Sequence, residues 1–185
     1  MTFPQVAVTL ATATVLAFAT SNAAYATAAA TAAPCVRGES ESRGNSAVDE
    51  GEIRWTEATE YDVERQHAAA EWNRLRKINI APDGASTVND LEFSDFNDKD
   101  SSAAGYYERH GGIAQTDFIY LNKHFLDVVY KNEPEFRKNI VLHELGHALG
   151  LCHKADTVDS VMRTDASLKV VPTAVDQANY KHICG

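Results

Sequence analysis

The sequence predicts one domain of the mixed α/β class over residues 51–185. Short alternating apolar segments next to turn residues, two long segments with helical spacing, and a length of 185 residues support this prediction. Apolar residues make up 44% and charged residues 23%, which is typical of a globular protein. The formal net charge of −9 argues against nucleic acid or an anionic membrane surface as the main partner.

The first 36 residues differ from the rest, because they contain no charged side chain. An apolar run from Val6 to Phe18 precedes the small-x-small triplet Ala24–Ala26, the pattern after which signal peptidases cleave. We therefore expect a signal peptide over residues 1–26 and a secreted, extracellular protein. A retained membrane anchor is the alternative, although so much Thr and Ala makes a weak spanning helix. Residues 27–50 hold few large apolar side chains and predict a flexible N-terminal tail or a short pro-segment.

The first half of the domain is predicted to contain a strand, a helix and further strands. Apolar residues at positions 61, 68, 72 and 75 share one face of a 3.6-residue period and predict a helix from Tyr61 to Lys77. Its basic end complements the helix dipole. Alternating segments predict strands at 51–55, 78–80, 88–93 and 117–121, and the irregular stretch 105–115 has the character of an edge strand.

The second half of the domain is predicted to be mainly helical. Pro134 suits the first turn of a helix from Glu133 to Leu149, because its missing N–H has no partner there in any case. Pro172 begins a final helix that runs through Ile183. Strands followed by these helices give the mixed α/β order from which the fold class is inferred.

The acidic segment Asp95–Asp100 has the composition of a calcium loop but fails its template. Lys99 occupies the fifth position, Asp100 the sixth in place of glycine, and Tyr106 the twelfth in place of glutamate. We therefore expect a solvated loop, and Ca²⁺ as a cofactor has no support in the sequence.

The candidate metal-binding residues lie in the segment 143–153, which reads HELGHALGLCH. Residues four apart on a helix share one face and lie about 6 Å apart along it, so His143 and His147 can bind one metal ion. His153 cannot reach the same point if the helix continues. We therefore expect the helix to end at Gly150, where glycine adopts positive φ, and the chain to turn back.

Three imidazoles leave the fourth position of a tetrahedral zinc ion open for water, as in catalytic sites. Glu144 directly follows the first ligand and is predicted to be the general base that takes a proton from this water. A stabilising zinc site without activity is the alternative, but such a site usually has a fourth protein ligand and no use for an acid at this position. The sequence thus predicts one catalytic Zn²⁺ bound by His143, His147 and His153.

This motif resembles that of the metzincins, zinc endopeptidases that carry a methionine-bearing turn downstream. Asp159–Met162 is similar to that turn, and the chain looks most like the secreted bacterial matrixin-like enzymes, which are relatives of the snapalysin-type and matrixin proteases. The likeness spans residues 51–185, and only the zinc motif is specific. It implies a compact catalytic domain of the α+β zincin type, with a twisted mixed sheet, an antiparallel edge strand, an active-site helix and a C-terminal helix. It also implies that Met162 lies beneath the zinc without binding it.

The resemblance further implies a zinc metalloendopeptidase whose protein or peptide substrate lies extended along an edge strand above the zinc helix. We expect this strand at Gly111–Gln115 and expect the loop from Met162 to Pro172 to line the pocket for the residue after the scissile bond. Thr164 stands where astacin-like and serralysin-like relatives carry a tyrosine, so no tyrosine is expected to assist. We expect a monomer, with no nucleic-acid partner and no stable membrane association after signal cleavage.

A non-catalytic, zinc-stabilised extracellular binding module is the competing hypothesis from another class. It predicts the same metal stoichiometry without turnover of peptides. Hydrolysis of a non-peptide amide at the same site is a third hypothesis, which no residue favours.

Three cysteines, Cys35, Cys152 and Cys184, allow one disulfide and leave one thiol, and the sequence does not choose among the pairings. A bridge at Cys152 would brace the loop that carries His153. Pro34–Gly38 only faintly echoes the latency segment of matrixins, so a Cys35 thiolate on the zinc is a minor alternative. The remaining histidines have no ligand spacing and are expected to have no special role: His67, His110, His124 and His182.

Overall fold

The computed structural model describes residues 30–111 and 115–185. Its strands are β1 (Glu52–Ala58), β2 (Asn79–Pro82), β3 (Leu91–Phe96), β4 (Gly105–Glu108) and β5 (Asp117–Asn122). Its helices are α1 (Asp62–Asn73), α2 (Pro134–Ala148) and α3 (Ala174–Cys184), with a short 3₁₀ helix, η1 (Arg43–Asn45), and a π-helical turn, η2 (His124–Val129). The strands form one sheet in the order β2-β1-β3-β5-β4. Only β4 runs antiparallel to its neighbour, so the prediction of a mixed α/β fold is confirmed.

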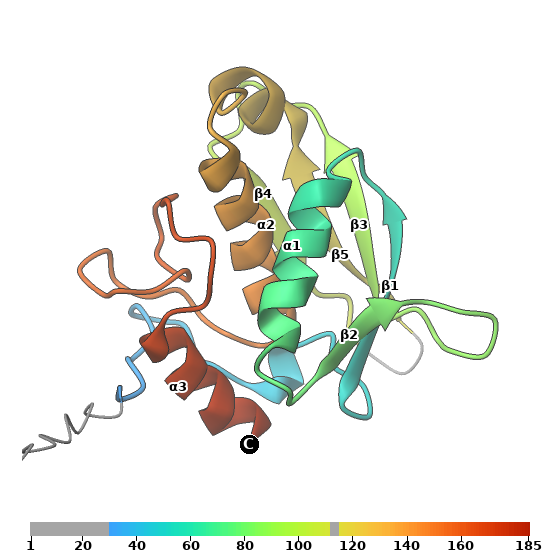
Figure 1. The fold of residues 1–185 in the computed structure, drawn as a ribbon, viewed down its shortest axis with the longest axis vertical. Helices are drawn as coiled ribbons and strands as arrows, with labels where there is room; N and C mark the ends of the chain where they lie inside the picture. Colours follow the sequence, from blue (N-terminus) through green and yellow to red (C-terminus); the bar gives the residue numbers. More distant parts are fainter. Residues whose placement is uncertain (1–29, 112–114) are drawn as a thin grey trace, which may run out of the picture.

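Helices α1 and α2 pack side by side on one face of the sheet, and α3 lies at the lower end of the molecule (Figure 1). The core between these layers is made of fully buried side chains such as Ile53, Phe93 and Ile119 from the strands and Trp72 and Leu145 from the helices. The indole N–H of Trp72 donates to the backbone carbonyl of Leu142 at 3.0 Å, which ties α1 to α2. This contact holds the helix that carries His143 and His147 against the rest of the core.

Helix α1 is shorter than the prediction of 61–77, because the chain leaves the helix after Asn73. The Asn73 amide donates to the carbonyl of Ile80 and accepts from its N–H, at 2.8 and 2.9 Å. These bonds turn the chain into β2, and Arg76 adopts a positive φ of 57° on the way. Leu75 still packs against the core from the turn, which explains why the apolar spacing continued beyond the end of the helix.

Strand β3 begins at Leu91, three residues later than predicted. Val88 is 58% exposed and lies in the preceding loop. The carboxylate of Asp90 accepts a hydrogen bond from the backbone N–H of Arg54 at 2.7 Å. A side chain therefore takes the place of a ladder bond, and the strand starts one residue after it.

The antiparallel edge strand is β4, in the first part of the stretch predicted at 105–115. Most of Gly111–Gln115, the expected substrate strand, lies outside the described residues. The predicted signal peptide, residues 1–26, also lies outside them. In the described part of the chain, no helix combines the length and apolar character that a membrane crossing needs.

Residues 30–50, the described part of the segment predicted at 27–50, lie against the domain. They pass between the end of α2 and α3 (Figure 1). Cys35 forms a disulfide with Cys152, with a Cα–Cα distance of 5.6 Å, and Cys184 is the free cysteine. Such a bridge is typical of proteins in an oxidising compartment. The segment is ordered by bonds to distant residues, which its local composition does not reveal.

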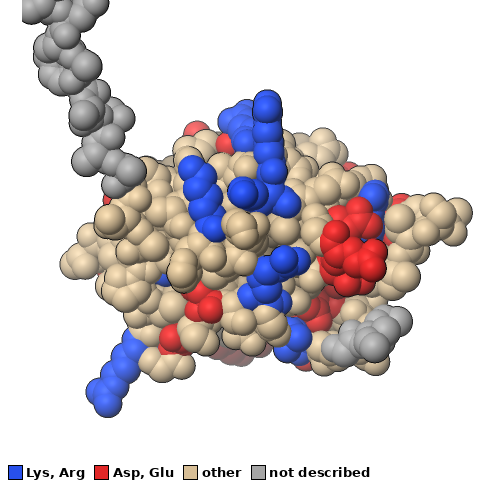
Figure 2. Space-filling model, turned by 90° about the horizontal axis from the view of Figure 1, so that it is seen from below, with Lys and Arg blue, Asp and Glu red and all other residues tan. Residues whose placement is uncertain are grey.

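The charged side chains on the lower face are mixed in sign (Figure 2). Lys and Arg side chains project separately from largely uncharged surroundings, and a compact acidic group lies beside them. On this face of the described residues, no continuous basic patch of the kind that binds nucleic acid is formed.

Candidate metal centre and active-site cleft

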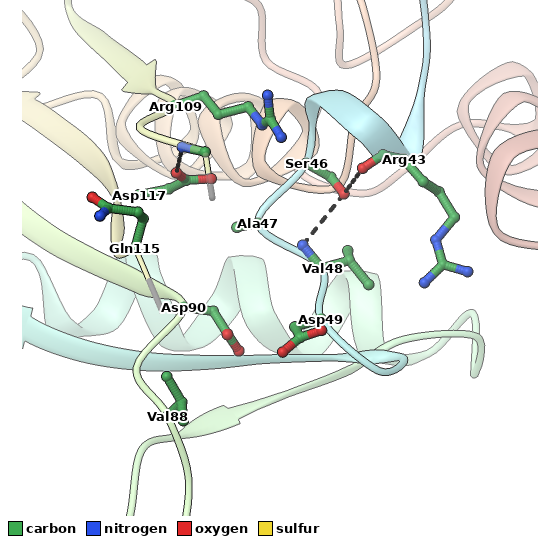
Figure 3. Close-up of a pocket in the computed structure, with 11 residues that line it drawn as sticks. Arg43, Ser46, Ala47, Val48, Asp49, Val88, Asp90, Arg109, Gln115 and Asp117 are labelled. Carbon is green, nitrogen blue, oxygen red and sulfur yellow. Dashed lines mark hydrogen bonds between the residues drawn. The ribbon is translucent and has the colours of Figure 1, made fainter. Parts of the chain in front are cut away.

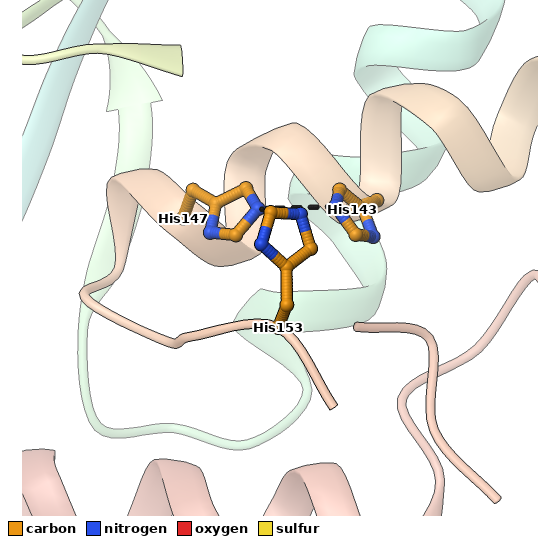
Figure 4. Close-up of side chains that lie close together, drawn as sticks. All are labelled: His143, His147 and His153. Carbon is orange, nitrogen blue, oxygen red and sulfur yellow. Dashed lines mark hydrogen bonds between the residues drawn. The ribbon is translucent and has the colours of Figure 1, made fainter. Parts of the chain in front are cut away.

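Helix α2 carries the first two histidines of the motif and ends where the sequence predicts. Gly150 has a φ of 93°, in the left-handed region. The N–H of Gly150 donates to the carbonyl of His147 at 2.8 Å and that of Leu151 to Gly146 at 3.0 Å, which together form a Schellman motif. The chain then turns back and brings His153 under the helix (Figure 4). The expectation that Gly150 ends the helix is thus confirmed.

The structure brings the three predicted metal ligands together. The Nε2 atom of His147 lies 3.0 Å from Nε2 of His143 and 3.2 Å from Nε2 of His153. The three ligand atoms all lie within 4.8 Å of one another. Two nitrogens bound to one tetrahedral zinc at about 2.0–2.1 Å are separated by about 3.3 Å. The three rings therefore fit a single ion of this size.

The second nitrogen of each ring faces an oxygen that accepts a hydrogen bond. Nδ1 of His143 lies 2.9 Å from the carbonyl oxygen of Val161, and Nδ1 of His147 lies 2.9 Å from that of Leu151. A carbonyl oxygen only accepts, so Nδ1 carries the proton and the lone pair of Nε2 points to the shared centre. Outer hydrogen bonds of this kind orient metal-binding histidines.

Burial keeps two of these rings neutral. Burial, and next the neighbouring His147, lower the pKa of His143 to about 3. Burial, and next the neighbouring His153, lower the pKa of His147 to about 4. Metal ions bind the neutral imidazole, so both rings are in the binding form at neutral pH.

Glu144 lies beside the cluster and is 7% exposed. It lines one cavity with His143 and His153 and a second with His147 and His153, at the place where β4 passes α2. Burial raises the pKa of Glu144 to about 8, against a smaller lowering by the backbone of Tyr107. A carboxyl group with a pKa near neutrality is suited to accept and return protons.

Met162 is fully buried directly beneath α2. A Cβ at Gly146 would overlap the Met162 sulfur and would lie 3.1 Å from its Cε. Glycine in the motif therefore allows the methionine turn to approach the helix between the two histidines that α2 carries. Met162 thus packs against α2 at Gly146, and its role beneath a metal ion stays a prediction.

Asp176, which sequence reasoning did not single out, holds this turn in place. Its carboxylate accepts from the Ser160 hydroxyl and from the N–H of Val161, the latter at 2.9 Å. It also forms the capping box of α3 with Thr173. The Val161 carbonyl in turn orients His143, so α3 is linked to the metal centre. The Thr-x-x-Asp pattern of a capping box was the available signal.

A cavity of about 470 Å³ opens beside the cluster. Its apolar wall is formed by Phe125, Tyr130 and Ile140. Residues 163–166, from the loop expected to line a pocket, do line this cavity. His143, Glu144 and His153 lie along it, so an occupant would contact the candidate ligands and the candidate base together.

The remaining predicted features do not join this centre. Cys35 is bonded to Cys152, so in this structure its sulfur is not a thiolate that could bind the metal. The first two residues of the predicted loop Asp95–Asp100 belong to β3 instead, and Asp95 accepts hydrogen bonds from Thr59 and Glu60 at 2.6 and 2.8 Å. Among residues 30–111 and 115–185, one other group of potential metal ligands lies close together: Cys35, Glu41 and Cys152. The sulfurs of its two cysteines form the disulfide.

A second cavity, of about 370 Å³, lies apart from the histidine cluster (Figure 3). Asp49 and Asp90 lie next to one another on one side of it, with Arg43 and Arg109 at its margin. Burial raises the pKa of Asp90 to about 6. None of the predicted ligands or the predicted base lines this cavity.

No protein-family model matches the chain, and no curated protein matches it. The structure itself provides a mixed α/β fold, a disulfide and a three-histidine cluster that could bind a metal ion. The nature of the ion and its use must therefore be argued from the chemistry of these residues.

Proposed function

We propose that the protein is a secreted zinc-dependent endopeptidase of the metzincin type, similar to bacterial matrixin-like enzymes. The observation that carries the proposal is the convergence of three Nε2 atoms, 3.0 and 3.2 Å apart, next to the buried carboxyl group of Glu144. Three neutral imidazoles are a typical ligand set of catalytic zinc, which keeps one position open. Among the described residues, no fourth metal-binding side chain joins the cluster.

The zinc ion would be bound by His143, His147 and His153. Glu144 would act as the general base and then as the general acid. When bound, zinc supplies a Lewis acid that lowers the pKa of water and polarises the substrate carbonyl. Glu144 accepts a proton as the water oxygen forms a bond to the carbonyl carbon. It then donates this proton to the amide nitrogen as the C–N bond breaks, which leaves a carboxylate and an amine. No side chain of the protein becomes acylated in this scheme.

The substrate is a peptide in extended conformation, and we propose that it pairs with β4 instead of the Gly111–Gln115 segment. β4 is the last strand of the described sheet, so one side of its backbone is free to pair. Its residues Gly105–Tyr107 line a cavity with Glu144, His147 and His153. A peptide added there would carry its scissile bond past the candidate base. The apolar wall of the larger cavity favours a bulky apolar residue after that bond.

The test compares Glu144→Ala with Glu135→Ala, a control that removes an exposed carboxylate from the first turn of the same helix. Cleavage of casein and of a peptide library is measured together with the zinc content of each protein. We expect Glu144→Ala to retain one zinc per chain and lose activity 100-fold or more. Full activity in Glu144→Ala would contradict its role. One zinc per wild-type chain with no turnover would favour the binding-module hypothesis.

A further inference from the structure

The loop that returns from α2 is held by a distant N-terminal segment, which we call the N-terminal strap (residues 33–47). Three backbone N–H groups of the strap donate to carbonyl oxygens at 2.8–3.1 Å: Ala47 to Ala148 at the end of α2, and Ser42 to Gly150 and Val36 to His153 in the return loop. A Cβ at Gly150 would overlap the carbonyl oxygen of Ser42, so the glycine also makes room for the strap. The strap therefore follows the return loop from the end of α2 to the third histidine.

His153 itself is clamped by one side chain of the strap, Glu39. One carboxylate oxygen accepts from the backbone N–H of His153 at 2.8 Å, and the other lies 2.9 Å from its Nδ1. The two bonds grip the backbone and the ring of the same residue, so they define the orientation of the side chain. They also place the proton on Nδ1 and direct Nε2 toward His147.

The third ligand needs such a clamp more than the other two. His143 and His147 are carried by a regular helix, and their Nδ1 atoms bond to backbone carbonyls. His153 lies in an irregular stretch after the helix, and the partner of its Nδ1 is a side chain 114 positions away. A ring free to rotate would have to be ordered when the metal binds, which weakens binding.

The residues on both sides of His153 are also bound to the strap, which keeps Glu39 in place. Cys152 forms the disulfide with Cys35. Lys154 is fully buried, and its ammonium group donates to Glu41 at 2.7 Å and to the carbonyl of Ala33 at 2.8 Å. Breaking a buried ion pair of this kind is strongly unfavourable. Three consecutive residues of the return loop are thus each held by the strap.

We propose that Glu39 is the positioning residue of the third metal ligand, and that the N-terminal strap belongs to the metal centre. This inference rests on the metal site of the proposed function. A carboxylate that accepts the outer N–H of a ligating histidine fixes the ring and strengthens its donor nitrogen. Removing such a partner typically weakens metal binding 10- to 100-fold. Residues 33–47 are accordingly required in the mature enzyme and are not a pro-segment to be discarded.

The experiment measures zinc affinity of the full chain by competition with a chromophoric chelator, for wild type, Glu39→Ala and Glu39→Asp. Glu39→Asp keeps the negative charge but withdraws the carboxylate by one methylene, so it separates position from charge. Glu50→Gln is the matched control, because it removes an exposed carboxylate close to the strap. Thermal unfolding of the metal-free proteins and the visible spectrum of the cobalt-substituted forms provide readouts that do not depend on activity.

We expect Glu39→Ala and Glu39→Asp to bind zinc at least 10-fold more weakly, with altered cobalt spectra and unchanged unfolding temperatures of the metal-free proteins. Glu50→Gln should bind zinc within twofold of wild type. Wild-type affinity in Glu39→Asp would overturn the proposal, since charge alone would then suffice, and wild-type affinity in Glu39→Ala would overturn it outright. A wild type that binds zinc without cleaving peptides would refute the proposed endopeptidase function but not the role of Glu39. A wild type that binds no zinc would refute both proposals.

Discussion

The Cys35–Cys152 disulfide should provide a large part of the stability of the domain. It joins residues 117 positions apart and closes the part of the chain that carries the sheet, α1 and α2 into one loop. The double variant Cys35→Ala/Cys152→Ala opens this loop while the backbone hydrogen bonds of the N-terminal strap remain possible. The main effect is then on the unfolded chain, which gains conformational entropy when the cross-link is absent.

The magnitude follows from the length of the loop. A closed loop of this size corresponds to about 5 kcal/mol of loop-closure free energy at 25 °C. Native disulfides typically contribute about 2–5 kcal/mol, so we expect a loss of about 3–5 kcal/mol in the double variant. Single domains have about 5–15 kcal/mol of stability in total, so the variant should fold but unfold at much lower denaturant concentration.

The assay is urea unfolding, followed by tryptophan fluorescence with the metal removed by a chelator, so that zinc affinity does not contribute. Cys184→Ser is the control, since it removes the free cysteine and leaves the bridge intact. Titration of thiols in the denatured, unreduced wild type should find one per chain. A stability loss below about 1 kcal/mol, or three titratable thiols, would refute the reasoning.

Three further predictions concern other parts of the structure. Asp90→Asn should stabilise the protein at pH 7 but not at pH 3.5: burial raises the pKa of Asp90 to about 6, so its contribution to stability falls as pH rises from about 4 to 6. The rise of this pKa from 3.8 corresponds to about 3 kcal/mol of unfolding free energy, which partial exposure of the carboxylate reduces to about 1 kcal/mol. Equal urea unfolding curves of wild type and Asp90→Asn at pH 7 would contradict this prediction. Gly146→Ala should destabilise the protein by about 1–2 kcal/mol in urea unfolding, because overlap with Met162 outweighs the better helix propensity; a gain in stability would disprove the close approach. Phenanthroline should abolish peptide cleavage and added zinc should restore it, whereas full activity in the chelator would exclude a catalytic metal.

The parts of the site predicted from the sequence depend on local spacing. The separation of His143 and His147 matches the period of a helix, and Gly150 ends that helix in a motif that glycine favours. The helical spacing of the apolar residues around Trp72 likewise predicted α1, but it did not predict the residue at which α1 ends. That end is decided by the Asn73 amide, which bonds to a later strand and leaves no periodic signal.

The missed features depend on contacts between residues far apart in the chain. The sequence did not decide which cysteine pairs with Cys152, because only the fold places Cys35 beside it. Glu39 lies in a segment with few apolar residues, where composition predicts flexibility, and its bond to His153 has no characteristic spacing. The buried pair of Glu41 and Lys154 gives that segment the anchorage that its own composition lacks.

The central claim is that three imidazoles hold one zinc ion and leave a place on it for water. X-ray absorption at the zinc edge of the purified full chain measures the number and kind of atoms bound to the metal. We predict one zinc per chain with three nitrogen ligands at about 2.0–2.1 Å and one oxygen from solvent. A fourth nitrogen or sulfur ligand from the protein, or a zinc content near zero, would contradict the account.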